Sequence, residues 1–144
     1  MEQYVGKLLG VDYGDVRTGL AVSDVTGFLA SGIGTVKPGG MKNTAVAVAK
    51  AAAEHSCVGI VVGLPKNMDG SEGFRAETVR AFVELLEKET ALPITMVDER
   101  LSTVTAHTYL SITDTRGKKR KEKVDALSAE IILQDFLDRR KNVR

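Results

Sequence analysis

The segment from Leu8 to Gly19, LLGVDYGDVRTG, constrains the fold of this chain more than any other. Its first apolar residues predict a buried strand, and Gly14 predicts a tight turn into a second strand. Asp12 ends the first strand, at or near the interior of a sheet. A lone buried carboxylate costs roughly several kcal/mol unless a cation or hydrogen bonds compensate it. The segment therefore predicts either a functional acid or an aspartate that only pins the turn through backbone amides.

The rest of the pattern predicts an α/β protein. Residues 18–24 and 28–36 are expected to be strands that form an antiparallel meander with the first strand, through a turn at 25–27. The continuous apolar run at 58–62 is typical of a parallel strand covered on both faces, and residues 92–97 are expected to form the next buried strand. Helices are expected over 41–55, from 72 or 73 to 89, over 102–112 and from about 122 to 140, with a mobile loop over 113–121.

Length and composition predict one domain that spans residues 1–144. With 144 residues and 43% hydrophobic content the chain can bury a core of its own. No apolar run approaches the roughly 20 residues that cross a bilayer, and the N-terminus lacks a signal-peptide pattern, so we expect a cytoplasmic protein with no membrane partner. The single Cys57, inside the apolar run CVGIVVG, is interpreted as a small buried hydrophobe and not as a nucleophile.

Charge is unevenly distributed along the chain, although the net charge is only +1. Residues 116–144 carry 10 basic and 5 acidic groups, whereas residues 1–115 carry 10 basic and 14 acidic groups. A basic segment beside an acidic body attracts a polyanion to one face.

Acidic residues stand at an apolar boundary in three separate segments. Asp12 follows the first strand, Asp98 and Glu99 follow the last one, and Asp125 begins the apolar stripe of the C-terminal helix, which continues with Ala129, Ile132 and Phe136. Clustered carboxylates repel one another, and their common use is to hold Mg²⁺ or Mn²⁺ for phosphodiester hydrolysis. The structural alternative is that Asp98 caps the following helix and that Asp125 pairs with Lys121 or Lys123.

Four sequence blocks resemble the motifs of the YqgF, or RuvX-type, family of RNase H-like nucleases. They are GVDYGDVRTGLAVSD, IVVGLPKNMDGS, VDERLST and KVDALSAEIILQDFL, in this order over nearly the whole chain. The resemblance implies an RNase H-like fold, in which a mixed five-stranded sheet combines a three-stranded antiparallel meander with two strands parallel to the first, flanked by helices. It also implies a nuclease that processes the 5′ end of pre-16S ribosomal RNA, with an older description as a Holliday-junction resolvase.

The resemblance implies catalytic and metal-binding acids at three positions: Asp12, the pair Asp98 and Glu99, and Asp125. Strand alternation lets only one side chain of the pair reach the metal, and we favour Glu99. The departures from the family pattern, Leu101-Ser102-Thr103 and Ser128, replace no acid.

Several basic residues are candidates for contact with nucleic acid. Arg17 and Arg100 lie a few residues from an acid, where each either meets a phosphate or ties loops together by a salt bridge. A further set is expected either to follow the nucleic-acid backbone or to form a solvated loop, and it comprises Lys66, Asn67, Arg116, Lys118, Lys119, Arg120, Lys121 and Lys123. The partner is then structured RNA, such as pre-16S ribosomal RNA, or branched DNA, and the sequence leaves open a monomer or a homodimer.

Two other classes of function compete with a nuclease. One is a non-catalytic nucleic-acid-binding protein that keeps only the groove of the fold, but the intact acids favour catalysis. The other is a phosphate-transfer ATPase, because turns like Asp12-Tyr13-Gly14 also occur in actin-type and sugar-kinase folds. A chain of 144 residues lacks the second half that such enzymes close over ATP.

Overall fold

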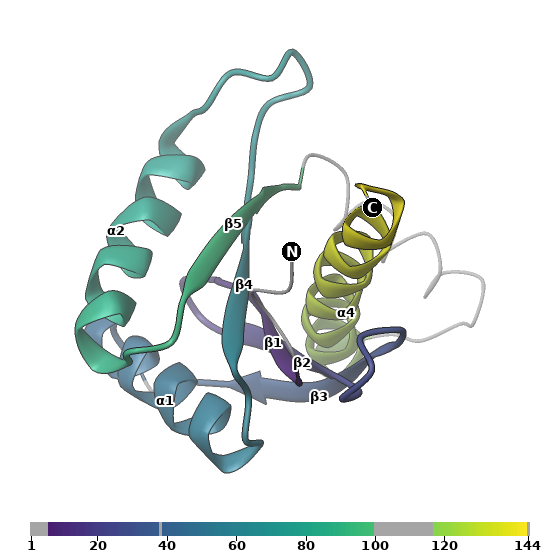
Figure 1. Ribbon diagram of the computed structural model, residues 1–144. Helices are drawn as coiled ribbons and strands as arrows, with labels where there is room; N and C mark the ends of the chain where they lie inside the picture. Colours follow the sequence, from purple (N-terminus) through teal and green to yellow (C-terminus); the bar gives the residue numbers. More distant parts are fainter. Residues whose placement is uncertain (1–5, 38, 100–116, 144) are drawn as a thin grey trace.

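The computed structural model of the protein describes residues 6–37, 39–99 and 117–143, with the side chains of 126–140 described in the last segment. Its elements are β1 (Leu8–Asp12), β2 (Thr18–Ser23), β3 (Ala30–Val36), α1 (Met41–Glu54), β4 (Gly59–Leu64), α2 (Phe74–Glu89), β5 (Ile94–Asp98) and α4 (Gly117–Val143) (Figure 1). The expected helix over 102–112 lies outside the described residues.

The five strands form one mixed sheet in the order β3-β2-β1-β4-β5. β1 pairs antiparallel with β2, which pairs antiparallel with β3. On its other side β1 pairs parallel with β4, which pairs parallel with β5. This arrangement confirms the predicted meander followed by two strands parallel to the first, and it gathers the carboxyl ends of β1, β4 and β5 at one edge.

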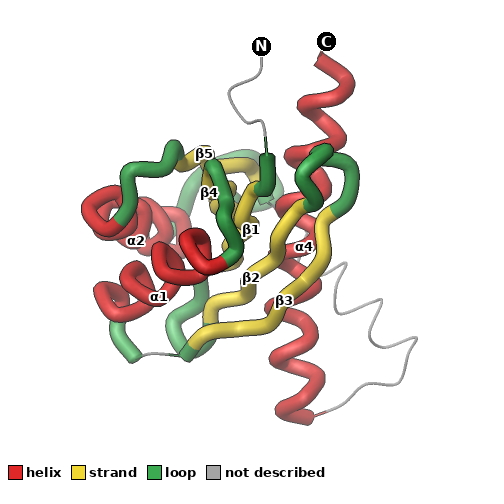
Figure 2. Tube along the Cα trace, turned by 60° about the horizontal axis from the view of Figure 1, so that its bottom comes forward, coloured by secondary structure: helices red, strands yellow, loops and turns green. Residues whose placement is uncertain are grey.

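Helices cover both faces of the sheet, with α1 and α2 on one side and α4 on the other (Figure 2). Alternation along β1 sends Leu9 and Val11 into the core under α1 and α2, whereas Leu8 faces α4. Phe82, fully buried in α2, stacks on the ring of Tyr13 with 4.4 Å between ring centroids. Each face of the sheet therefore has a hydrophobic core of its own.

Two glycines let α4 approach the strands closely. A Cβ atom at Gly10 of β1 would lie 2.7 Å from the Cβ of Leu133 and 3.0 Å from the carbonyl oxygen of Ala129. A Cβ atom at Gly63 of β4 would lie 2.5 Å from the Cδ1 of Ile132. Both positions need a residue without a side chain because the helix occupies that space.

The hairpin between β2 and β3 is longer than predicted, because β3 begins at Ala30 and not at Phe28. The Asp24 carboxylate accepts hydrogen bonds from the backbone N–H groups of Phe28 and Leu29, at 2.9 and 3.0 Å. It also accepts one from the hydroxyl of Thr26. These bonds hold residues 28 and 29 in the turn, where they cannot pair as strand residues.

The C-terminal helix α4 starts earlier than predicted, at Gly117 and not near residue 122. The expected loop over 113–121 is therefore wrong from residue 117 onward, and Lys118, Lys119, Arg120 and Lys121 belong to the helix. Lysine, arginine and glutamate are good helix formers, and neither proline nor glycine interrupts the sequence after Gly117. On the face toward the sheet the fully buried apolar side chains are Ala129, Ile132, Leu133 and Leu137, while Phe136 is only half-buried.

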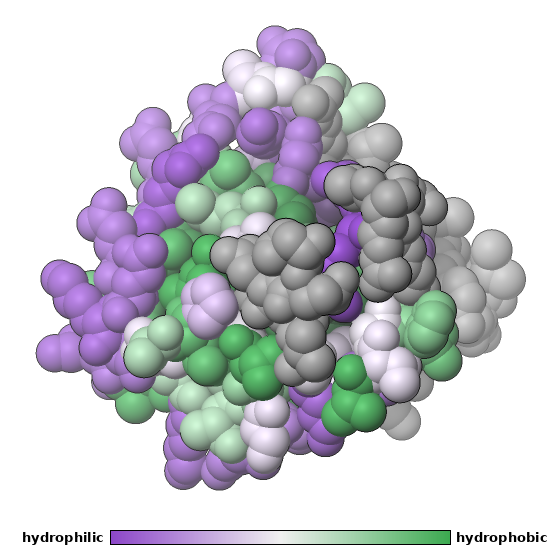
Figure 3. Space-filling view, in the orientation of Figure 1, coloured by the Kyte–Doolittle hydropathy of each residue, from purple (hydrophilic) through white to green (hydrophobic). Residues whose placement is uncertain are grey.

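Cys57 is a free and buried thiol, as the sequence predicted. Its burial raises the pKa of the thiol. In the described part of the chain no helix is both long and apolar enough to cross a membrane. The space-filling view shows a hydrophilic edge along α2 and hydrophobic residues toward the middle of the molecule (Figure 3).

Candidate active site

Asp12 and Glu99 lie at the carboxyl ends of strands, on the same face of the sheet. Asp12 is the last residue of β1 and shares, by alternation, the α4 face with Leu8 and Gly10. Glu99 follows β5, and its Cγ atom lies above Gly63, where a Cβ atom would be 3.1 Å away. The negative charge of Asp12 contributes to raising the pKa of Glu99. The two acids are thus electrostatically coupled neighbours beside α4.

Glu99 is a half-buried acid with an unusual pKa. Burial, with help from the negative charge of Asp135, raises the pKa of its carboxyl group to about 7, against the lowering effect of Arg139. One of its oxygens, Oε1, is buried and has no hydrogen-bond partner among the described residues. The positive charge of Arg139 does not offset the effect of burial on the pKa, and a buried oxygen without a hydrogen-bond donor is destabilising. A divalent cation between Glu99 and Asp12 would provide one, so the residues fit a bound metal.

Asp98 is oriented differently from Glu99. Met96 packs in the core beside α1 and α2, whereas Val97 packs in the core beside α4. Alternation along β5 therefore places Asp98 on the face of Met96, and Glu99 on the face of Val97. Asp98 contributes least of the named charges to the raised pKa of Glu99.

Asp125 lies in α4, but its side chain is outside the described set. Ala129, one helical turn later, lies against Gly10 of β1, two residues before Asp12. Ser128, on the same stretch of helix, has a fully buried hydroxyl without a partner in the described part of the chain. Among the described residues no group of three potential ligands is close enough to hold a metal ion. The convergence of Asp12, Glu99 and Asp125 stays a prediction.

Two charged residues near Glu99 were not anticipated from the sequence. Asp135 of α4 is the largest charge contribution to the raised pKa of Glu99, ahead of Asp12. Arg139, one turn later, pairs with Asp135 at 2.7 Å between Nη2 and Oδ2. The spacing of four residues on one helix is compatible with such an ion pair, but no sequence signal indicates that the pair lies beside β5.

Arg75 was not among the residues predicted from the sequence. Its guanidinium donates to the carbonyl oxygen of Tyr13, at 3.4 Å, and lies 3.7 Å from the carboxylate of Asp15. It therefore connects the start of α2 to the turn that follows Asp12. Arg17, in the same turn, is half-buried, whereas Arg100 and Arg116 lie outside the described residues.

Lys66 and Asn67 lie in the loop between β4 and α2. Lys66 is half-buried, and its positive charge contributes to lowering the pKa of Glu72. The Asn67 side-chain amide donates to the hydroxyl of Ser71 at 3.0 Å, and its backbone N–H donates to the carbonyl of the same residue at 2.9 Å. Asn67 is therefore an organiser of the loop as well as a candidate for nucleic-acid contact.

A family model and curated relatives match almost the whole chain. The family model for RuvX, described as Holliday junction resolvase, matches residues 6–139. A relative from Paracoccus denitrificans is 46% identical over 93% of this chain and 85% of its own length. One from Clostridium novyi is 44% identical over 92% of this chain and 98% of its own length. Both bear the name "Putative pre-16S rRNA nuclease".

Solved structures of junction resolvases share the fold. RuvC of Thermus thermophilus, in complex with a Holliday junction substrate, aligns over 94% of this chain and 96% of its own, with a TM-score of 0.54 and 13% identity. The Fowlpox virus resolvase aligns over 92% of this chain and 97% of its own, with a TM-score of 0.51 and 13% identity. At this identity the likeness concerns the arrangement of the strands and helices, which is RNase H-like.

Proposed function

The chain belongs to the RuvX family of nucleases, and we propose on that premise that it hydrolyses phosphodiester bonds of the precursor of 16S ribosomal RNA in a metal-dependent reaction. The observation that supports this proposal is the buried Oε1 atom of Glu99, near Asp12, which has no hydrogen-bond partner among the described residues. The match over residues 6–139 supports a single nuclease domain, and processing of ribosomal RNA implies a place in the cytoplasm.

The metal would be held by Asp12, Glu99 and Asp125, whereas Asp98, next to Glu99 in the chain, lies on the other face of the sheet. Carboxylate oxygens are the ligands that Mg²⁺ and Mn²⁺ prefer. Such an ion, when bound, activates a water molecule and stabilises the charge on the leaving oxygen. The sheet supplies the rigidity that this chemistry needs, because Asp12 ends β1 and the Glu99 N–H donates to the carbonyl of Leu64 at 3.0 Å.

Ribosomal RNA is the favoured substrate because curated relatives at 42–46% identity are named "Putative pre-16S rRNA nuclease". A second candidate substrate is a four-way DNA junction, which the description of the family model favours. A protein that binds nucleic acid without cleaving it is the third outcome.

Binding of nucleic acid is expected to depend on the basic residues at the start of α4. Replacing Lys118, Lys119, Arg120 and Lys121 together with glutamine removes four positive charges. If these side chains neutralise phosphates, the slope of log affinity against log salt becomes flatter, by roughly 0.7 to 0.9 for each phosphate that the variant no longer neutralises. An unchanged slope means that these residues are only solvated.

The deciding experiment compares cleavage of a pre-ribosomal RNA fragment and a four-way DNA junction, with Mg²⁺, with Mn²⁺ and with chelator. Asp12→Asn preserves the size of the side chain and removes one charge. We expect cleavage by this variant to fall by orders of magnitude, while thermal stability in chelator is unchanged or higher, because repulsion among the acids is relieved. Glu54→Gln, which removes an exposed carboxylate at the end of α1, is the control and should cleave normally. Full cleavage by pure Asp12→Asn protein would refute the proposed mechanism.

A further inference from the structure

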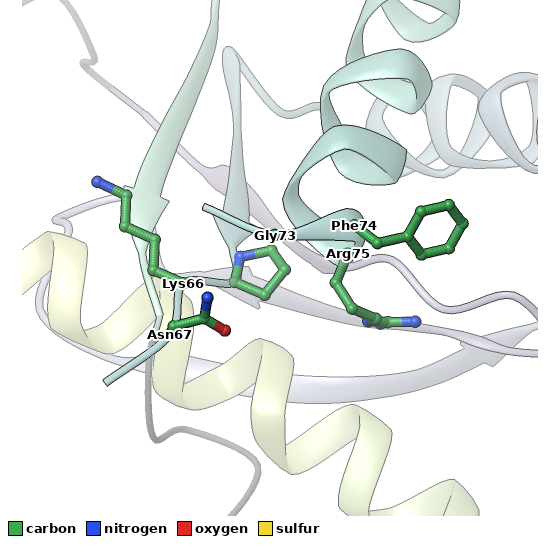
Figure 4. Close-up of a pocket in the computed structure, with 6 residues that line it drawn as sticks. Lys66, Asn67, Gly73, Phe74 and Arg75 are labelled. Atoms are coloured by element: carbon green, nitrogen blue, oxygen red, sulfur yellow. The ribbon is translucent and has the colours of Figure 1, made fainter. Parts of the chain in front are cut away.

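A pocket with a volume of about 230 Å³ opens at the connection between β4 and α2. Its lining consists of Pro65, Lys66, Asn67, Gly73, Phe74 and Arg75. In the close-up the side chains of Lys66 and Arg75 extend to opposite sides of Asn67, and the ring of Phe74 projects outward beyond Gly73 (Figure 4). The pocket thus has a positive charge on either side and an aromatic ring at its rim.

Hydrogen bonds within the loop hold the pocket in shape. The backbone N–H of Gly70 donates to the carbonyl of Asn67 at 2.9 Å, and Gly70 has a left-handed φ of 91° that suits glycine. The carboxylate of Asp69 accepts from both the N–H and the hydroxyl of Ser71, at 2.9 and 2.6 Å. A site already ordered in this way loses little conformational freedom when a ligand binds.

The pocket follows the carboxyl end of β4, at the same edge of the sheet as the candidate acids. Pro65 directly follows Leu64, whose carbonyl accepts the hydrogen bond from the N–H of Glu99 at 3.0 Å. Arg75 donates to the carbonyl of Tyr13, the residue that follows Asp12, at 3.4 Å. A nucleic acid with one phosphate at the acids would therefore bring its neighbouring nucleotides to this pocket.

Phe74 is the most exposed of the aromatic residues that the structure describes. Its side chain is 78% exposed at the first position of α2, apart from the buried stripe of that helix, which includes Val79 and Phe82. A single exposed apolar residue needs no explanation. Here, however, the ring lies on the same side of the pocket as the Arg75 side chain, with Lys66 on the opposite side (Figure 4), next to a candidate nuclease site.

Acidic groups near the pocket are largely engaged. Arg80 binds Glu72 through two hydrogen bonds, at 2.8 and 2.9 Å, and Asp15 lies 3.7 Å from Arg75 in a solvent-exposed pair. An exposed pair of this kind is weak and readily gives way to a phosphate.

We infer that this pocket binds an unpaired nucleotide of the substrate, with the base stacked on Phe74 and the flanking phosphates at Lys66 and Arg75. A positively charged groove with an exposed aromatic ring is the usual means of binding single strands, whose bases present free faces. A base within a duplex is already stacked on both sides and cannot use the ring. The inference rests on the proposed function and adds that the cleaved bond lies next to a single-stranded segment.

The test measures binding in chelator, where no metal-dependent cleavage occurs. The probes are a short single-stranded RNA that carries the fluorescent base 2-aminopurine and the same RNA annealed to its complement. We expect the single strand to be bound more tightly, with quenching of 2-aminopurine as it stacks. Phe74→Ala should weaken binding of the single strand about tenfold and abolish the quenching, while binding of the duplex stays the same. Phe74→Leu, which keeps an apolar side chain, should behave like Phe74→Ala, and Phe74→Tyr should restore binding.

Matched controls separate stacking from general effects. Phe28→Ala removes another exposed aromatic ring, 58% exposed in the turn between β2 and β3. This variant should bind both RNA probes as tightly as the wild type does. Lys66→Ala and Arg75→Ala should each reduce the salt slope for the single strand by about 0.7, whereas Lys88→Ala at the far end of α2 should leave it unchanged.

Two results would overturn the inference. One is equal binding of the single strand by the wild type and Phe74→Ala, and the other is an equal loss for the single strand and the duplex. The proposed function fails separately, through undiminished cleavage by Asp12→Asn, because the binding measurements involve no cleavage.

Discussion

The backbone N–H of Glu99 donates a hydrogen bond to the carbonyl oxygen of Leu64, with 3.0 Å between the two atoms. This bond continues the pairing of β4 with β5 one residue beyond Asp98. The backbone of Glu99 is therefore held by the sheet, while its side chain lies over Gly63 toward α4. Folding thus forces the carboxyl group into a half-buried position, and its ionisation is coupled to stability.

Glu99→Gln should change the pH dependence of stability in chelator. The folded-state pKa of Glu99 is raised from 4.5 to about 7, so the folded protein holds the proton more tightly than the unfolded chain. The wild type should lose stability as the pH rises from about 4.5 to about 7, and the variant should lack this loss. Above about pH 7 the melting temperature of the variant should exceed that of the wild type.

The control for this prediction is Glu54→Gln, which should follow the wild type at every pH. Thermal unfolding over the pH range is the measurement, and cleavage by Glu99→Gln should fall by orders of magnitude. Parallel stability curves for Glu99→Gln and the wild type would show that Glu99 is not buried as described.

Gly63→Ala should displace the candidate acid Glu99. The new Cβ atom would lie 2.5 Å from the Cδ1 of Ile132 and 3.1 Å from the Cγ of Glu99, so both side chains must shift. Overpacking of this kind costs about 1–3 kcal/mol. Denaturant unfolding should show this loss, and the cleavage rate should fall together with it.

The double variant Gly63→Ala, Ile132→Val separates the two clashes. Valine lacks the Cδ1 atom, so much of the stability should return, but the clash with Glu99 remains and cleavage should stay low. Full recovery of cleavage in the double variant would contradict the placement of Glu99 above Gly63.

Gln134→Ala should loosen the hairpin from α4. The Gln134 amide accepts from the N–H of Ala30 and donates to the carbonyl of Phe28, each at 2.9 Å. Loss of both bonds should lower the free energy of unfolding by about 1–2 kcal/mol. Denaturant unfolding checks the value, with the exposed Glu84→Ala on α2 as a control that should lose much less. If Gln134→Ala loses no more free energy of unfolding than Glu84→Ala, water molecules replace the hydrogen bonds of the amide without loss of stability.

Asp24→Asn should reveal the contribution of the hairpin turn at acidic pH. Hydrogen bonds, first from Thr26 and then from the backbone of Leu29 and Phe28, lower the pKa of Asp24 from 3.8 to about 2. The stabilisation by the charged form is thus present above about pH 3.8 and is lost as the pH falls through about 2. The difference in melting temperature between the wild type and the variant should shrink over that interval. A constant difference would mean that the charge of Asp24 has no part in the turn.

Local sequence patterns predicted most of the fold. Apolar runs such as 58–62 predicted the parallel strands, because a strand buried on both faces needs an apolar residue at every position. The predictions were wrong for residues 28–29, which do not belong to β3, and for the start of α4. The Asp24 carboxylate binds the backbone N–H groups of Phe28 and Leu29, which places both residues in the turn. At the start of α4 the basic residues were predicted to form a loop because of their charge, but their high helix propensity makes them part of the helix.

The candidate site was predictable only in part. Asp12 and Glu99 could be anticipated because each follows an apolar strand, and the resemblance to the RuvX family is confirmed. Asp135 and Arg75 could not, because their positions depend on how α4 and α2 pack against the sheet, which no local pattern encodes. The exposure of Phe74 could have been predicted, because an apolar residue outside the buried stripe of its helix faces solvent.

The packing of α4 also bears on the order of events during synthesis. Every strand that the structure describes precedes α4 in the chain, yet α4 packs on one face of the sheet, the face of Leu8, Val61 and Val97. A nascent chain whose final helix is still inside the ribosome therefore exposes that apolar face and has no enclosed site around Glu99. The site around Glu99 is therefore expected to be complete only once α4 has left the ribosome and packed on the sheet.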